Sequence, residues 1–263
     1  MSKKLKACIL DWSGTVVDPY VMAPALAFQK LFQKNNILIT LDEARIPMGL
    51  RKDIHIKSIL QIPRIKKNWY SYYGRSPNEF ELNSMYKHYI PLQKEILKDY
   101  SDIIPGVNTT IDILRNKFNF KIGLTTGFNR ELSSILVNKT EQQGLILDSV
   151  VASDDVLHGI RPKPFMIYKN LENLNISSPQ SVIKVDDTIS GIHEGLEAGC
   201  ITVGVSKYSN YMNITDLSLI SKHDLELRNE NVKKKMGKAG AHFVIDSVND
   251  LPKIILKLKL NGR

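Results

Sequence analysis

The sequence predicts an α/β protein with an open parallel sheet, helices on both faces of that sheet, and an all-helical domain inserted after the first strand. Two patterns support this fold class. Apolar runs with the length of buried strands alternate with helical patterns, which is typical of parallel sheets. Residues 19–100, in contrast, contain almost no strand pattern. The expected strands cover residues 5–11, 121–127, 148–153, 181–187, 201–206 and 242–247.

Residues 1–18 and 101–263 are expected to form the α/β core, and residues 19–100 the helical cap. In the cap, residues 23–33 have a helical pattern. Capping boxes at residues 40–43 and 76–79 predict two further helix starts. In the core, helices are expected over residues 130–143, 164–174 and 189–198, and residues 208–238 are polar without a clear pattern.

Composition narrows the class of protein. The chain has 263 residues, 43% hydrophobic and 24% charged, as in soluble globular proteins. The apolar runs are too short to span a bilayer, and no signal peptide precedes the first strand, so no membrane partner is expected. Cys8 and Cys200 fit buried thiols of a reducing compartment, which predicts a cytoplasmic location. The net charge of +9 comes from scattered basic clusters, which favours a solvated surface over a nucleic-acid-binding surface. The positive electrostatic field of the protein favours a small anionic substrate.

Carboxylates follow two of the predicted strands. Asp11 ends the first strand, and Asp186 and Asp187 end the fourth, at the edge where parallel sheets bind ligands. From its position alone, Asp11 is either a nucleophile and metal ligand or a helix N-cap. Two adjacent buried carboxylates are costly without a cation, and Mg²⁺ is the natural partner of such oxygens.

Two further segments offer groups that bind a phosphoryl oxygen. Thr126 and Gly127 follow a strand, where a hydroxyl and backbone N–H groups either bind such an oxygen or close a turn. Arg161 precedes a predicted helix and could hold both the Asp11 carboxylate and a transferring group, with Lys163 as the reserve.

These segments, residues 11–18, 125–127, 159–164 and 185–191, in this order resemble the haloacid dehalogenase superfamily of phosphotransfer enzymes. The resemblance covers nearly the whole chain, including the inserted cap. It implies that Asp11 attacks phosphorus and forms an aspartyl-phosphate. It also implies one Mg²⁺ held by Asp11, the backbone carbonyl of Ser13, Asp187 and Asp186.

Ser13 departs from the pattern of the superfamily's phosphatases. Those enzymes carry a second Asp two positions after the nucleophile, which protonates the leaving alkoxide as a general acid. A serine hydroxyl is too weak an acid for this role near neutral pH. The protein is therefore either impaired, or its leaving group is not an alkoxide.

The cap segment resolves this choice. Residues 44–55, with residues 62–65, Trp69 and residues 240–243, resemble the phosphonoacetaldehyde hydrolases of the superfamily. The resemblance implies that Lys52 forms a Schiff base with the substrate aldehyde and that Met48 and Gly127 contact the substrate. His55 lies three residues after Lys52, on the same helical face, and could move protons.

The chemistry of such a reaction is consistent with Ser13. Breaking a P–C bond expels a carbanion, and a protonated imine takes up those electrons as an enamine, so no general acid is needed. The resemblance also implies a homodimer joined through the caps. The aromatic residues Trp69, Tyr70, Tyr72 and Tyr73 suit either that interface or core packing.

Three positions differ from the family pattern. Gly191 stands where many phosphonoacetaldehyde hydrolases carry a metal-binding Asp, and we expect Asp186 to supply the missing charge. Phe128 replaces a common Tyr, and Val21 stands where a Cys can occur. The predicted function is hydrolysis of phosphonoacetaldehyde to acetaldehyde and phosphate. The alternatives are a phosphomonoesterase of the same fold and a catalytically impaired binding or regulatory paralogue.

Overall fold

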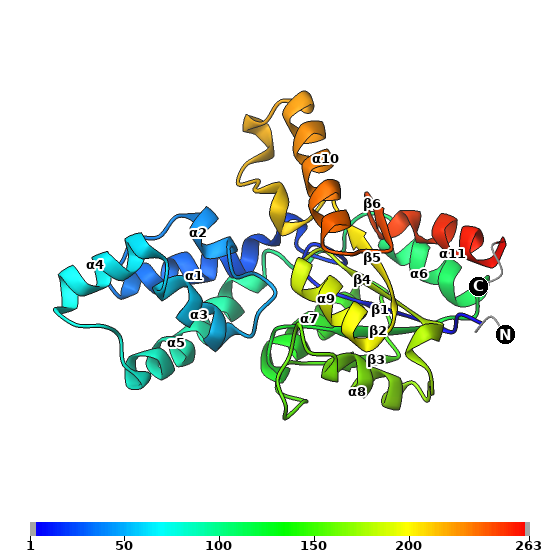
Figure 1. Cartoon of the computed structure of the whole chain (residues 1–263), viewed down its shortest axis with the longest axis horizontal. Helices are drawn as coiled ribbons and strands as arrows, with labels where there is room; N and C mark the ends of the chain where they lie inside the picture. The colour runs from blue at the N-terminus through cyan, green and yellow to red at the C-terminus, as the bar shows by residue number, and fades with distance from the viewer. Residues whose placement is uncertain (1–3, 261–263) are drawn as a thin grey trace.

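The computed structural model describes residues 4–260, so residues 1–3 and 261–263 of the predicted core lie outside the described range. Within that range, the chain forms one six-stranded parallel sheet in the order β3-β2-β1-β4-β5-β6 (Figure 1). The strands are β1 (Ala7–Leu10), β2 (Lys121–Thr125), β3 (Ser149–Val151), β4 (Val182–Asp186), β5 (Ile201–Val205) and β6 (Phe243–Ile245). The predicted α/β fold with a parallel sheet is therefore confirmed.

The strands read as apolar runs because helices cover both faces of the sheet. The core helices are α6 (Val107–Asn116), α7 (Arg130–Gln142), α8 (Phe165–Asn173), α9 (Ile189–Ala198), α10 (Lys222–Lys238) and α11 (Leu251–Leu260). Along β1, Ala7 and Ile9 pack with residues of α8, while Cys8 and Leu10 share a cluster with residues of α6, α7 and α11. Alternating side chains of one strand thus serve two cores.

Five short 3₁₀ segments complete the secondary structure of residues 4–260: η1 (Pro19–Val21), η2 (Pro179–Ser181), η3 (Asn210–Met212), η4 (Leu217–Leu219) and η5 (Val248–Asp250). The helix α10 occupies the polar region that gave no sequence pattern. Ser221 caps its N-terminus by accepting a hydrogen bond from the Asp224 N–H, and only Val232 and Met236 of this helix are buried. Its weak apolar periodicity explains why the sequence did not predict it.

The inserted segment contains helices and no named strand, which agrees with the predicted helical cap. Its helices are α1 (Met22–Lys34), α2 (Leu41–Arg45), α3 (Lys52–Leu60), α4 (Pro63–Tyr73) and α5 (Glu79–Leu97). They form a body at one end of the molecule, beyond the carboxyl edge of the sheet (Figure 1). Phe28 of α1 stacks on Tyr89 of α5, with ring centroids 4.6 Å apart, inside the cap.

The two predicted capping boxes have different outcomes. The Thr40–Glu43 box is present at the start of α2. The Ser76–Glu79 box is wrong, because α5 begins two residues later, with Asn78 and Glu81 capping each other. Arg75 fixes this later start by donating to both carboxylate oxygens of Glu81 at 2.8 Å.

The cap aromatic residues divide between core and surface. Trp69 is buried and packs near Tyr73, so it belongs to the cap core, whereas Tyr70 and Tyr72 are exposed. In residues 4–260, we find no helix that combines the length and the apolar character needed to cross a membrane.

The connection from β1 into the cap has an unusual backbone. Asp18, Tyr20 and Val21 have φ angles of +51°, +67° and +55°, in the left-handed region that residues with a side chain rarely adopt. The Asp18 carboxylate accepts hydrogen bonds from the N–H groups of Met22 and Ala23 at the start of α1. This contact ties the end of the β1 loop to the first cap helix.

Candidate active site

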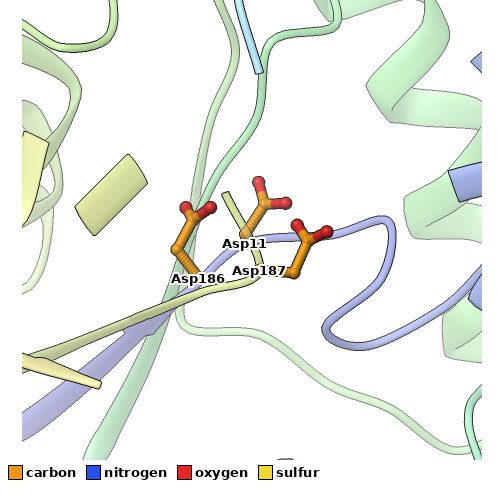
Figure 2. Close-up of side chains that lie close together, drawn as sticks. All are labelled: Asp11, Asp186 and Asp187. Atoms are coloured by element: carbon orange, nitrogen blue, oxygen red, sulfur yellow. The ribbon is translucent and has the colours of Figure 1, made fainter. Parts of the chain in front are cut away.

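The strand order of the sheet changes direction beside β1, which creates the crevice where doubly wound sheets bind ligands. Asp11 follows β1, and Asp186 and Asp187 lie at the end of the neighbouring β4. Figure 2 shows the three carboxylates projecting from this edge in the same general direction. One oxygen from each side chain lies within 4.8 Å of the others, and all three residues are buried.

The buried carboxylates have strongly perturbed acidities. Burial raises the pKa of Asp187 well above its usual value, and the charges of Asp11 and Asp186 raise it further. Burial also raises the pKa of Asp11, although Arg161 opposes the shift. The Asp187 Oδ1 atom has no hydrogen-bond partner among the described residues. This donor set of hard oxygens, one of them unpartnered, fits a divalent cation such as Mg²⁺.

Arg161 is the cation closest to Asp11. Its Nη2 atom donates to Asp11 Oδ1 at 2.7 Å and to Thr125 Oγ1 at 2.7 Å. Lys163, the reserve candidate, instead lies at the surface and donates to the backbone oxygen of His158. Arg161 therefore takes the position beside Asp11 that the sequence assigned to a cation.

Two buried residues of this network were missed by the sequence analysis. Lys184 Nζ lies 2.9 Å from Asp186 Oδ2 and donates to Thr125 Oγ1 at 2.7 Å. Glu194 Oε2 accepts from Arg161 Nε at 3.0 Å and lies 3.3 Å from Lys184 Nζ. Burial alone would raise the pKa of Asp186, but the charges of Arg161 and Lys184 outweigh this effect and lower it. A lysine inside an otherwise apolar strand was the available sequence signal for this network.

The turn after Asp11 depends on Gly14. Its φ is +78°, and a Cβ there would lie 2.6 Å from Asp187 Oδ2. A side chain at this position would therefore collide with the carboxylate cluster. Ser13, in the same turn, is buried. Together with Asp11 it lines a small cavity at the carboxyl edge of the sheet. Thr126 and Gly127, after β2, also line it, and the Thr126 hydroxyl accepts a hydrogen bond from the Phe128 N–H.

Lys52 enters this site from the cap. It is the first residue of α3, it is only 6% exposed, and it lines the same cavity as Asp11. Its Nζ lies 5.0 Å from the centroid of the Phe128 ring and 5.9 Å from that of Phe28. No described residue forms a hydrogen bond or ion pair with it. Burial lowers the pKa of Lys52 to about 8, with Arg161 acting in the same direction and Asp11 opposing it.

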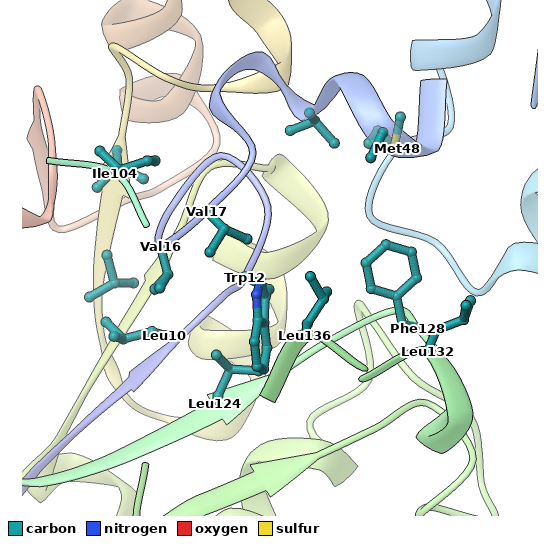
Figure 3. Packing of buried hydrophobic residues seen from close by; sticks show 14 of the residues in the cluster. Leu10, Trp12, Val16, Val17, Met48, Ile104, Leu124, Phe128, Leu132 and Leu136 are labelled. Atoms are coloured by element: carbon teal, nitrogen blue, oxygen red, sulfur yellow. The ribbon is translucent and has the colours of Figure 1, made fainter. Parts of the chain in front are cut away.

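The cap loop before α3 closes the site. Gly49, with φ +93°, approaches the core so closely that a Cβ would overlap Ser190 Oγ and lie 3.0 Å from Thr188 Oγ1. Met48 lines the cavity beside it, and Figure 3 shows Phe128 extending from the loop after β2 toward Met48. The cavity is partly open to solvent and measures about 30 Å³, space for roughly two waters. A larger substrate therefore requires the cap to move.

His55 lies in the cap interior behind this cavity and is not one of the residues that line it. Its ring stacks on Phe28 with centroids 3.8 Å apart, and its Nε2 lies 2.8 Å from the Ala44 carbonyl oxygen. Burial, reinforced by the charge of Lys52, lowers the pKa of His55 well below its usual value. His55 is therefore a neutral ring, and its Nδ1 has no partner among the described residues.

Gly191 and Val21 lie close to the site. Val21 lines the cavity. Gly191, in the first turn of α9, faces the carboxylate of Asp186, which occupies the space where a side chain at position 191 would begin. Asp186 is held there by the N–H and the hydroxyl of Thr188, at 2.9 and 2.7 Å.

The sheet order, the helical insertion and the carboxylates at the switch point define a class of enzymes with a doubly wound core and a helical cap. The profile of the haloacid dehalogenase-like hydrolases matches residues 8–205. The chain belongs to this enzyme family, and within it to the group of phosphonoacetaldehyde hydrolases.

Similarity to members of that group extends over nearly the whole chain. A phosphonoacetaldehyde hydrolase of Paraburkholderia phytofirmans is 38% identical over 259 residues, which cover 98% of this chain and 96% of the relative. That of Bacillus cytotoxicus is 38% identical over 254 residues, or 96% of each chain. The crystal structure of a phosphonoacetaldehyde hydrolase-like protein from Oleispira antarctica has a TM-score of 0.95 and 35% identity, and covers 99% of this chain and 94% of that one.

Proposed function

We propose that this enzyme hydrolyses the P–C bond of phosphonoacetaldehyde to acetaldehyde and phosphate, through a Schiff base on Lys52 and an aspartyl-phosphate on Asp11. One observation carries the proposal. A buried cap lysine whose pKa is lowered to about 8 lines the same small cavity as the buried Asp11 carboxylate. A lysine with a lowered pKa condenses with carbonyls, and a carboxylate attacks phosphorus.

In the first step, the neutral Lys52 amine adds to the aldehyde carbon, and loss of one water together with uptake of one proton leaves a protonated imine. His55, neutral and one helical turn away, is our candidate for moving protons during this condensation. The apolar faces of Phe28 and Phe128 beside Nζ favour the uncharged amine.

In the second step, an oxygen of Asp11 attacks phosphorus as the P–C bond breaks, and the electron pair of that bond moves into the imine to give an enamine. Arg161 neutralises developing charge beside Asp11, and Thr126 and the Gly127 N–H, whose residues line the same cavity, bind phosphoryl oxygens. Protonation and hydrolysis of the enamine release acetaldehyde and restore Lys52. Another water cleaves the aspartyl-phosphate.

A metal ion completes this proposal. Asp11, Asp187, Asp186 and the backbone carbonyl of Ser13 would hold Mg²⁺, which would offset the negative charge of the carboxylates and the phosphoryl group. The carboxylate of Asp186, seated in the space left by Gly191, supports its role as the replacement acid.

The assembly and location follow the same reasoning. We propose a cytoplasmic homodimer joined through the caps, with residues 19–100 moving as one unit against the core. The exposed rings of Tyr70 and Tyr72 on α4 offer apolar area for such an interface. Cys8 and Cys200 are free, buried thiols, as expected in a reducing compartment.

Reductive trapping tests the proposed function. The protein is incubated with phosphonoacetaldehyde and borohydride, and the adduct is located by mass spectrometry. We expect a single adduct on Lys52, its loss in Lys52→Arg, and its retention in Lys57→Arg, which changes an exposed lysine of the same helix. Turnover of an aryl phosphate is measured alongside. Fast aryl phosphate hydrolysis without an adduct would favour a phosphomonoesterase. Absence of both the adduct and aryl phosphate hydrolysis would indicate an impaired paralogue.

A further inference from the structure

A second cavity lies between the cap and the core, away from the proposed active site. It measures about 360 Å³, within the range of small-molecule sites. Arg45 of α2 contributes from the cap, Asn210 and Tyr211 from η3, and Asn231 and Lys235 from α10. Among the residues described, the two cavities share no lining residue. The larger cavity is therefore a separate feature of the cap–core junction.

Two of the residues that line this cavity carry buried polar atoms without partners among the described residues. Arg45 is 3% exposed, and it donates from Nη1 to Asn213 Oδ1 at 3.0 Å and from Nη2 to the Ile214 carbonyl at 2.7 Å. Its Nε has no partner among the described residues, and neither has Oδ1 of Asn210, which is 2% exposed. Buried polar groups are normally satisfied, so this part of the cap–core junction carries one unmet donor and one unmet acceptor.

The charge of the cavity favours an anion. Arg45 and Lys235 are its two cations, and Asp42 is its one acid. Lys235 makes no ion pair within residues 4–260, and its Nζ lies over the Tyr211 ring, 3.7 Å from the centroid. A ligand oxyanion beside this ammonium group would be attracted by both positive charges.

The same wall is hydrogen-bonded to the proposed metal site. The N–H of Asn210 donates to Asp187 Oδ2 at 2.8 Å, and the Ser209 hydroxyl donates to the Asp187 carbonyl at 2.8 Å. The Tyr211 hydroxyl accepts from the N–H of Ile189, the first residue of α9. A molecule bound in the cavity would contact the cap through Arg45 and the segment that orients Asp187.

We propose that this cavity is a regulatory site for a small carboxylate or phosphate. Bound there, the anion bridges α2 of the cap and α10 of the core, and so stabilises the closed arrangement. Because coupling between two sites is reciprocal, closure of the cap on an active-site ligand should also tighten binding of the anion.

Direct binding to the full-length protein tests this site independently of catalysis. Isothermal titration with glycerol 3-phosphate and with malate probes the two anion classes, and glycerol serves as the uncharged control. We expect at least one of the two anions to bind and glycerol not to bind. Lys235→Glu should weaken that binding tenfold or more, whereas Lys234→Glu, the same change at an adjacent exposed lysine outside the cavity, should leave it within twofold.

Hydrogen exchange locates the bound anion. We expect increased protection of residues 41–46 and 209–213 in the wild type, and none in Lys235→Glu. Absence of binding by both anions, or binding that Lys235→Glu and Lys234→Glu affect equally, would overturn the proposal. Neither result would bear on the Lys52 adduct, so the regulatory site and the proposed reaction fail separately.

Discussion

The carboxylate of Asp186 occupies the space that a side chain at position 191 would need. A Cβ built on Gly191 would overlap the Cγ and both oxygens of the Asp186 carboxylate. Thr188 and Lys184 hold that carboxylate in place, at 2.7 and 2.9 Å. In this arrangement the site can take an acid from position 186 or from position 191, but not from both.

This exclusion predicts a reciprocal pair of variants. Gly191→Asp and Asp186→Gly should each lower Mg²⁺ affinity about tenfold or more, the first by displacing Asp186 and the second by removing it. The double variant should recover most of the affinity, because the two changes are coupled. Isothermal titration with Mg²⁺ measures all three. Gly237→Asp is the control, since a side chain on that glycine of α10 meets open space. A double variant no tighter than the singles would contradict the exclusion.

Closure of the cap should depend on Gly49. Gly49→Ala adds a methyl group that overlaps Ser190 Oγ, so we expect kcat/KM for phosphonoacetaldehyde to fall at least about tenfold. Gly74→Ala is a matched control, because Gly74 also has a positive φ, of +70°, and no neighbour within 4 Å of the added Cβ. Both variants carry a similar backbone penalty, roughly 1 kcal/mol, so any further loss of thermal stability in Gly49→Ala reports its overlap with Ser190. Equal kcat/KM in the two variants would show that the Gly49 contact does not matter.

The protonation of Lys52 predicts the pH dependence of imine formation. Only the neutral amine condenses, so the trapping rate should rise about tenfold per pH unit and level off above pH 8, where the pKa of Lys52 lies. The yield of the Lys52 adduct after short borohydride pulses at pH 6 to 9.5 measures this profile. A rate independent of pH over that range would be inconsistent with a lysine titrating near pH 8.

Burial of Lys52 also predicts a stability effect. Folding lowers the pKa of Lys52 from 10.5 to about 8, so the cost of its buried charge is fully present below pH 8 and is relieved as the pH rises toward 10.5. Lys52→Met should therefore unfold at higher urea concentration than the wild type at pH 7, with a gain of up to roughly 3 kcal/mol. The gain should shrink at pH 9.5, and a gain that grows with pH would have the wrong sign.

His55 should make the fold sensitive to acid. Its pKa is lowered in the folded state, so the unfolded chain binds a proton first and stability is lost as the pH falls below about 6.5. In His55→Phe, which keeps a ring against Phe28, the free energy of unfolding should change less between pH 7 and pH 5. His88→Phe, at an exposed position of α5, should retain the wild-type profile, and chemical denaturation at several pH values compares the three proteins.

Several parts of the site follow from local sequence. Asp11 and Asp187 could be placed because each follows an apolar run, and strand ends of a parallel sheet meet at one edge. Lys184 and Glu194 could not, because they meet through the packing of β4 against α9, a contact that no sequence spacing encodes. The helix α10 was missed for a related reason, since only Val232 and Met236 bury it.

The left-handed residues at the entrance to the cap have an energetic consequence. The left-handed backbone conformation costs about 1–3 kcal/mol of free energy at each of Asp18, Tyr20 and Val21. The cost is hardest to avoid at Val21, because its Cβ is branched. The connection between β1 and α1 therefore stores strain. Contacts between the cap and the core, such as Gly49 against Ser190 and Arg45 against Ile214, help to offset it. Weakening those contacts should therefore destabilise the arrangement of cap and core without any change in residues 18–21.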